Sequence, residues 1–296
     1  MKPIVILGDI NIDIILSGMR SSPVLGREIL AKCSVMELGG SAANVAAMLA
    51  MNSCPVRFFA SVGNDSNGRY LINCLKEFHI DTDTITIADD EPTGITVSLT
   101  YPHERMYISH LGTVASTKLE TFSDGYLCKG SHLHLSSYFL QKGLKTSVGC
   151  LLRQAKEIGM TTSLDPGGDP SDEWDINGLQ AYLQYLDWFM PNADEIKAVT
   201  KTCSIDDAVI NFSQEVTGVI VKMGPQGAMT RYKGKVEKWP GLGRQAIDTT
   251  CAGDCFNAGF LYGLTSGNPL PKAVYMGNQY GAQSVLNVGL PRQKIK

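Results

Sequence analysis

The segment Asp248-Thr249-Thr250-Cys251-Ala252-Gly253-Asp254 places small residues and two carboxylates immediately before an apolar helical pattern. The first turn of a helix leaves backbone N–H groups unpaired, and small side chains let an anion approach them. Such a site stabilises the charge that builds on a phosphoryl group during transfer, and Asp254 beside it can take the proton of an attacking hydroxyl. The structural alternative is that Asp254 balances the helix dipole and Asp248 is a turn residue. The segment by itself leaves both interpretations open.

Three further segments carry glycines or polar side chains where a strand meets a helix or a turn. They are Gly39-Gly40-Ser41-Ala42-Ala43-Asn44, Pro191-Asn192-Ala193-Asp194-Glu195 and Val221-Lys222-Met223-Gly224-Pro225-Gln226-Gly227. Taken singly, they also fit a tight turn before a capped helix, a capping box and a hairpin turn. The chain has no Gly-x-x-x-x-Gly-Lys-Ser/Thr loop and no Gly-x-Gly-x-x-Gly after its first strand, which counts against P-loop and dinucleotide-binding enzymes.

In this order and spacing, the four segments resemble the signatures of the ribokinase/phosphofructokinase-B (pfkB) family of carbohydrate kinases. The segment ending at Asp254 is similar to Asp-Thr-x-Gly/Ala-Ala/Gly-Gly-Asp, and the segment ending at Asn44 to the sugar-binding turn Gly-Gly-x-x-x-Asn. The other two are similar to the Asn-x-x-Glu motif and to the strand and turn along the nucleotide. The resemblance covers essentially the whole chain. It implies an ATP-dependent kinase that uses magnesium and a monovalent cation, usually potassium.

The resemblance also implies a role for individual residues. Asp254 is the implied catalytic base, and the backbone amides of Cys251, Ala252 and Gly253 form the implied anion hole. The implied ligands of the monovalent cation are Asp248 and Thr250, while Glu195 holds magnesium through water. The predicted nucleotide-binding residues are Asn192, Glu195, Lys222, Gly224, Gly227 and Asn278. The predicted substrate-binding residues are Asn11, Asp13, Gly39, Gly40, Asn44, Arg105 and Asp165.

The implied reaction transfers the γ-phosphate of ATP to a primary hydroxyl of a small sugar of the ribose, fructose or keto-sugar-acid type. A carboxylate such as Asp13 accepts two neighbouring hydroxyl donors, which suits a polyol. Arg105 does not by itself indicate a phosphorylated substrate, because a lone surface arginine is usually solvated. Two alternatives stay open: a nucleoside kinase of the same family, with Tyr138-Phe139 stacked on a ring, and a sugar-binding regulator without catalysis.

Cys251 departs from the family pattern, which more often has glycine or alanine at this position. Because a thiol at a helix N-terminus has a lowered pKa, we expect a reactive Cys251 whose alkylation or oxidation blocks the anion hole. The alternative is a buried filler. The chain has eight cysteines without a secretory signal, which indicates reduced thiols rather than a disulfide scaffold.

Composition and charge argue against nucleic-acid and membrane partners. The 296 residues include 26 Lys+Arg and 29 Asp+Glu, a formal net charge of −3, with no basic run to bind a phosphate backbone. No apolar run reaches the roughly 18 residues needed to cross a bilayer. Asp9 follows the first apolar run too early for a signal peptide. We therefore expect a cytoplasmic protein with small-molecule partners.

Short β-branched runs alternate with helical patterns along most of the chain, which predicts a parallel sheet with helices on both faces. Strands are expected at Pro3–Leu7, Val56–Val62, His132–Ser136, Thr161–Leu164, Trp188–Met190 and Thr217–Met223. Helices are expected at Ala42–Met51, Ser66–Phe78, Leu144–Ile158, Asn192–Thr200, Ser204–Glu215, Ala252–Thr265 and Leu270–Leu286.

Two segments, about 12–37 and 93–111, contain strand-like runs without helices between them, and we expect both to be antiparallel excursions from the main sheet. Joined into one small sheet, they would form a lid over the site, and the alternative is that they are edge strands of the main sheet. The resemblance implies a single ribokinase-like domain over residues 1–296. Its fold is a three-layer α/β/α sandwich with a mainly parallel central sheet and a small β-sheet lid, through which two copies form a homodimer.

Overall fold

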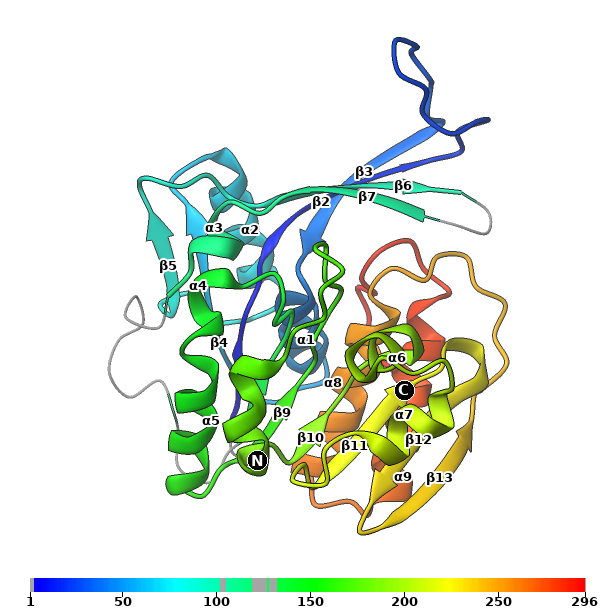
Figure 1. Ribbon diagram of the computed structural model, residues 1–296. Coiled ribbons are helices and arrows are strands. Elements are labelled where there is room, and N and C mark those ends of the chain that lie inside the picture. Colours follow the sequence, from blue (N-terminus) through cyan, green and yellow to red (C-terminus); the bar gives the residue numbers. More distant parts are fainter. Residues whose placement is uncertain (1–2, 102–104, 119–126, 128–131, 296) are drawn as a thin grey trace.

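The computed structural model describes residues 3–101, 105–118, 127 and 132–295, so residues 102–104 of the second lid segment lie outside the described part. The predicted strand–helix alternation forms one sheet in the order β13-β12-β11-β10-β9-β8-β1-β4-β5 (Figure 1). Its strands are β1 (Ile4–Leu7), β4 (Val56–Gly63), β5 (Ile85–Ala88), β8 (His132–Leu135), β9 (Thr161–Leu164), β10 (Trp188–Phe189), β11 (Gly218–Lys222), β12 (Gly227–Tyr232) and β13 (Lys235–Pro240). Neighbouring strands from β5 to β11 are parallel, and only β12 and β13 are added antiparallel. The mainly parallel sheet is confirmed.

Helices cover both faces of this sheet, because its central strands are apolar on both sides. In β1, Ile4 and Ile6 belong to one buried cluster, whereas Val5 and Leu7 belong to the other. The first cluster includes α1 (Ser41–Met51), α2 (Ser66–Glu77), α8 (Ala252–Thr265) and α9 (Leu270–Ser284). The second includes α5 (Val148–Glu157), the 3₁₀ helix η2 (Asn177–Tyr185), α6 (Ala193–Thr200) and α7 (Ile205–Asn211). The three-layer prediction is therefore confirmed.

Several element boundaries differ from the predictions. The helix expected over Leu144–Ile158 is interrupted, with a short α4 (Lys142–Lys145) before α5, and α7 ends four residues before Glu215. The short helices α3 (Thr113–Ser116) and η3 (Gly224–Gln226) complete the helical elements of the described residues. Strand β13 carries no alternating pattern because it is an edge strand whose residues are mostly exposed. No helix within the described ranges combines the length and the apolar character that a membrane span requires.

The two lid segments form a second, separate sheet in the order β3-β2-β6-β7, which excludes the edge-strand alternative. Its strands are β2 (Asn11–Ser17), β3 (Cys33–Gly39), β6 (Ile95–Thr100) and β7 (Arg105–His110). Each segment is an antiparallel hairpin, as expected, but β2 and β6 run parallel. The two antiparallel excursions are therefore confirmed, and a parallel strand pair joins them into one sheet.

The register of the lid sheet gives it one polar and one apolar face. Partners across the strands share a face, so Asp13, Thr96, Tyr107 and Arg105 lie on the same side. The opposite side carries Ile14, Val97, Met36 and Ile108, of which Met36 is 46% and Ile108 61% exposed. Figure 1 shows this sheet at one end of the molecule, with its hairpins extending beyond the central sheet.

Candidate active site

Asp254 lies in the first turn of α8 and connects this helix to α1. Its carboxylate accepts hydrogen bonds from the Ser41 hydroxyl at 2.7 Å and from the Asn44 amide at 2.9 Å. Two of the predicted segments, more than 200 residues apart in sequence, therefore meet at one carboxylate. Burial raises the pKa of Asp254 to about 7, although the hydrogen bonds from Ser41 and Asn44 oppose the shift. A carboxyl with this pKa is well matched to accept a proton near neutral pH.

The start of α1 is held in place from the first strand. Asp9 is buried, and its carboxylate accepts hydrogen bonds from the backbone amides of Ser41 and Ala42, each at 2.9 Å, and from the Ser137 hydroxyl at 3.0 Å. Gly40 has φ of +96°, and a Cβ there would lie 2.7 Å from the Asp9 carbonyl oxygen. Asp9 is therefore not a surface residue, and it positions the turn that presents Asn44.

The predicted substrate-binding residues of the lid and of α1 lie together. Asn11 donates to the Asp13 carboxylate at 2.7 Å, and Gly39 pairs with Asn11 in the lid sheet. A Cβ on Gly39 would lie 2.2 Å from an Asp13 oxygen, so only glycine leaves room for this arrangement. Burial raises the pKa of Asp13 to about 6, and the charge of Asp9 adds to the shift.

The side-chain oxygen of Asn44 is buried and has no hydrogen-bond partner among the described residues. A buried acceptor left unpaired is unfavourable, so this oxygen is suited to accept a hydrogen bond from a bound hydroxyl.

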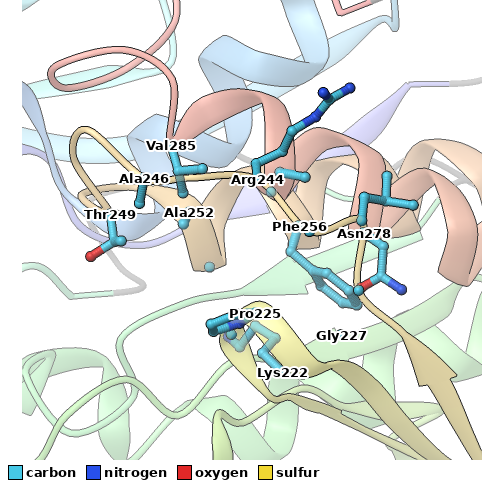
Figure 2. A pocket seen from close by; sticks show the side chains of 17 residues that line it. Lys222, Pro225, Gly227, Arg244, Ala246, Thr249, Ala252, Phe256, Asn278 and Val285 are labelled. Atoms are coloured by element: carbon cyan, nitrogen blue, oxygen red, sulfur yellow. The ribbon is translucent and has the colours of Figure 1, made fainter.

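A groove with a volume of about 170 Å³ runs from the N-terminus of α8 toward α9 (Figure 2). It brings together the predicted nucleotide-binding residues Lys222, Gly224, Gly227 and Asn278. Ala252 and Gly253 of the predicted anion hole line the same groove.

Other residues that line the groove were missed from the sequence. They are Leu242 and Arg244 in the loop after β13, Phe256 on α8 and Val285 after α9. The glycines Gly241 and Gly243 around Leu242 were the available signal, since paired glycines often mark a backbone that a ligand approaches closely.

Lys222 joins the groove to a cluster of buried acidic residues. Its ammonium forms an ion pair with Asp165, whose carboxylate also accepts hydrogen bonds from Asn257 and from the Gly167 amide. The structure thus brings Asp165 to Lys222 at the groove rather than to Asn11 and Asp13. Burial raises the pKa of Glu195 to about 7, and repulsion from Asp165 adds to the shift.

Asn192 and Glu195 form the capping box of α6. The Asn192 side chain accepts from the backbone amides of Asp194 and Glu195, each at 2.9 Å, and Glu195 accepts from the Asn192 amides at 2.7 and 2.8 Å. Across the described ranges, no three His, Cys, Asp or Glu side chains are grouped as a metal site. Magnesium, which keeps several waters and phosphate ligands in kinases, fits Glu195 only as an outer group.

Cys251 is the N-cap residue of α8, with φ of +60°. This left-handed conformation is one that glycine adopts freely and that other residues rarely adopt. Burial raises the pKa of the Cys251 thiol well above its usual value, and the charge of Asp254 adds to the effect. The expectation of a lowered pKa and a reactive thiol is therefore wrong, because desolvation and nearby carboxylates outweigh the helix N-terminus.

Arg105, predicted to bind substrate, extends from the lid to the loop before α8. Its guanidinium donates to the Asp248 carboxylate at 2.6 Å and to the Thr250 hydroxyl at 2.8 Å. Both acceptors are residues predicted to bind a monovalent cation. Burial alone would raise the pKa of Asp248, but hydrogen bonds from Gly289 and Thr250 and the charge of Arg105 hold it below its usual value.

The raised pKa of Asp254 predicts how stability depends on pH. The folded state holds a proton on Asp254 up to about pH 7, whereas the unfolded state loses it near pH 4. The stabilising contribution of this proton is complete below pH 4 and is lost as the pH rises through about 7. Asp254→Asn keeps a neutral group at all pH values, so we expect its Tm relative to the unchanged protein to increase between pH 5 and pH 8.

Differential scanning calorimetry of both proteins across this pH range measures the difference. The control is Asp83→Asn, which removes an exposed carboxylate. A Tm difference for Asp254→Asn that stays constant with pH would show that the carboxyl is not buried as described.

The structure combines a mainly parallel α/β/α fold with a groove that ends at a helix N-terminus, next to a carboxyl whose pKa is raised to about 7. These features are compatible with phosphoryl transfer. Residues 1–293 match the model of the pfkB family carbohydrate kinases, and the chain belongs to this family. It is a sugar kinase, a phosphotransferase that acts on an alcohol group.

Known proteins agree with this assignment. A ribokinase of Haemophilus influenzae is 26% identical over 299 residues, which span 97% of this chain and 94% of the relative. The 2-dehydro-3-deoxygluconokinase of Bacillus subtilis is 27% identical over 84% of this chain and 80% of the relative. The structure of Arabidopsis thaliana ribokinase with ribose and ATP has a TM-score of 0.84 and 25% identity, covering 99% of this chain and 95% of that one.

Proposed function

We propose that this protein transfers the γ-phosphate of ATP to a primary hydroxyl of a small, unphosphorylated sugar of the ribose, fructose or keto-sugar-acid type, with Asp254 as the base. The observation that carries the proposal is the position of Asp254. It follows Ala252 and Gly253, which line the groove, and it accepts a hydrogen bond from Asn44 of the predicted sugar site. A hydroxyl bound beside Asn44 would therefore lie next to the carboxylate and face the groove.

The chain's own residues supply the remaining functions. Asn11 and Asp13 on the lid and the free oxygen of Asn44 accept hydrogen bonds from sugar hydroxyls. The amides at the start of α8 stabilise the charge on the transferred phosphoryl group, because they point along the helix axis at a fixed position. The lid sheet excludes water and so limits hydrolysis of ATP.

Lys222, Gly224, Gly227 and Asn278 bind the nucleotide along the groove. Magnesium bound to the phosphates would neutralise their charge, and Asn192 and Glu195 at the start of α6 would hold its water shell.

The test of this proposal is a panel of acceptors in an ADP-release assay with ATP and magnesium. We expect ADP release well above the ATP-only background for a ribose, fructose or sugar-acid acceptor. Release with nucleosides alone would support the nucleoside kinase alternative, for which Tyr138 and Phe139 are poorly suited because both are buried in the core. Background release with every acceptor would support the sugar-binding regulator instead.

We further propose a cytoplasmic homodimer formed through the lid. On the apolar face of the lid, the two edge strands expose large side chains: Met36 on β3 and Met106 and Ile108 on β7. Exposed apolar patches of this kind are typical of protein–protein contacts, and a second copy of the lid presents the same surface. Sedimentation velocity measures the oligomeric state. The cytoplasmic part of the proposal is supported by the cysteines of the described residues, which are free thiols, as is usual in a reducing compartment.

A further inference from the structure

Asp248 stands at the position predicted to bind a monovalent cation, but both oxygens of its carboxylate already accept hydrogen bonds. One oxygen accepts from Arg105 at 2.6 Å, from the Thr250 amide at 2.9 Å and from the Thr250 hydroxyl at 2.7 Å. The other oxygen accepts from the Gly289 amide at 2.9 Å. A potassium ion on the oxygen that Arg105 binds would have to displace a donor, and the guanidinium would repel an ion bound to either oxygen, so the site does not fit the ion as it stands.

The group that reaches this position is itself a cation. Arg105 binds the two predicted cation ligands at once, with one terminal nitrogen on Asp248 and the other on Thr250. Both members of the ion pair are largely buried, since their side chains retain 15% and 4% of their exposure. A guanidinium is permanently charged and more weakly hydrated than an ammonium, which suits it to a buried position of this kind.

We propose that the Arg105 guanidinium takes the place of the monovalent cation at Asp248 and Thr250, so that the protein needs no potassium. The loop that Arg105 contacts leads directly into the predicted anion hole, because Thr250 precedes Cys251, Ala252 and Gly253. Arg105 therefore supplies a positive charge on the protein side of the transferred phosphoryl group, as a bound potassium ion would.

Arg105 belongs to the lid, so, unlike a bound ion, its charge moves with the lid. Arg105 is the first residue of β7 and lies on the same face of the lid as Asp13. The lid thus brings the substrate-binding carboxylate and the positive charge to the site together. The positive charge of Arg105 therefore lies next to the predicted anion hole only while the lid contacts the loop before α8.

Thermal unfolding tests the proposal without any substrate. The unchanged protein, Arg105→Ala, Arg105→Lys and the control Arg27→Ala, which removes an exposed arginine of the same lid, are compared in potassium chloride and in tetramethylammonium chloride at equal ionic strength. We expect potassium to raise the Tm of Arg105→Ala by about 2 °C, because the vacated position can then bind the ion. We expect no potassium-specific change in the unchanged protein, in Arg105→Lys, which retains a cation, or in Arg27→Ala.

Activity with an acceptor found in the substrate panel gives a second readout, and this arm rests on the proposed function. We expect the unchanged protein to be equally active with and without potassium, and Arg105→Ala to become activated by potassium. Strong potassium activation of the unchanged protein, or a potassium-dependent Tm in it, would overturn the proposal. A higher KM for the sugar in Arg105→Ala without any potassium effect would instead place Arg105 at the substrate. Because the Tm arm requires no catalysis, its failure is distinguishable from failure of the proposed function.

Discussion

Asp254→Asn is expected to lower kcat by about 10²–10⁴-fold, the range that general-base catalysis contributes, while ATP binds with unchanged affinity. Asparagine has nearly the same shape as aspartate but cannot accept the proton of the attacking hydroxyl. The amides at the start of α8 and the groove residues remain in place, so nucleotide binding has no reason to change. Steady-state kinetics and isothermal titration with ATP measure the two quantities.

The pH dependence separates a catalytic role of Asp254 from a structural one. Because the pKa of Asp254 is about 7, kcat/KM of the unchanged protein should rise with pH through this value. This rise should disappear in Asp254→Asn, whereas the control Asp83→Asn should keep it. An Asp254→Asn protein with full turnover would exclude the carboxylate as the base.

Lys222→Met is expected to lower the free energy of unfolding by about 3–5 kcal/mol, because it leaves the carboxylate of Asp165 buried without its partner. Burial raises the pKa of Glu195 to about 7 and the charge of Lys222 opposes this shift, so removing the lysine leaves a second acidic group without a compensating charge. Combining Lys222→Met with Asp165→Asn should recover most of the loss, since the second change removes the unpaired charge. Urea unfolding of the two single variants and the double variant measures this coupling.

A surface ion pair gives the matched control. Lys238 and Asp206 pair at 3.0 Å, but both side chains are more than half exposed. Lys238→Met should therefore change stability by only about 0–1 kcal/mol. If Lys222→Met and Asp165→Asn destabilised the protein additively, the two residues would not form the buried pair described.

Much of the fold could be predicted from the sequence because the pattern that drives it is local. The strands next to β1 are short apolar runs, and the helices between them have one apolar face. Both patterns are visible in the sequence because the core buries the strands and one face of each helix. The parallel pairing of β2 with β6 could not be predicted. It depends on where the two hairpins, which are far apart in sequence, extend from the central sheet. Strand β13 was missed because an exposed edge strand needs no apolar pattern.

The site residues that belong to contiguous sequence motifs could be predicted. The contacts of residues whose partners are far away in the sequence could not. The glycines at 39 and 40 and the aspartate at 254 belong to contiguous segments, and the structure brings these segments together. The partners of Asp165 and Arg105 come from far along the chain, so the sequence could not show that the first pairs with Lys222 or that the second binds Asp248. Cys251 illustrates a competition between effects: the helix N-terminus was visible in the sequence, but the burial that outweighs it was not.

Phosphorus NMR of the reaction mixture tests the central claim most directly, because it identifies both the group transferred and the oxygen that accepts it. ATP, magnesium and the active acceptor are incubated with the protein, and the product is recorded without proton decoupling. The account predicts a new phosphomonoester signal split into a triplet by the two protons of a primary carbon. A doublet would mean transfer to a secondary hydroxyl, and the appearance of inorganic phosphate alone would contradict sugar phosphorylation by this protein.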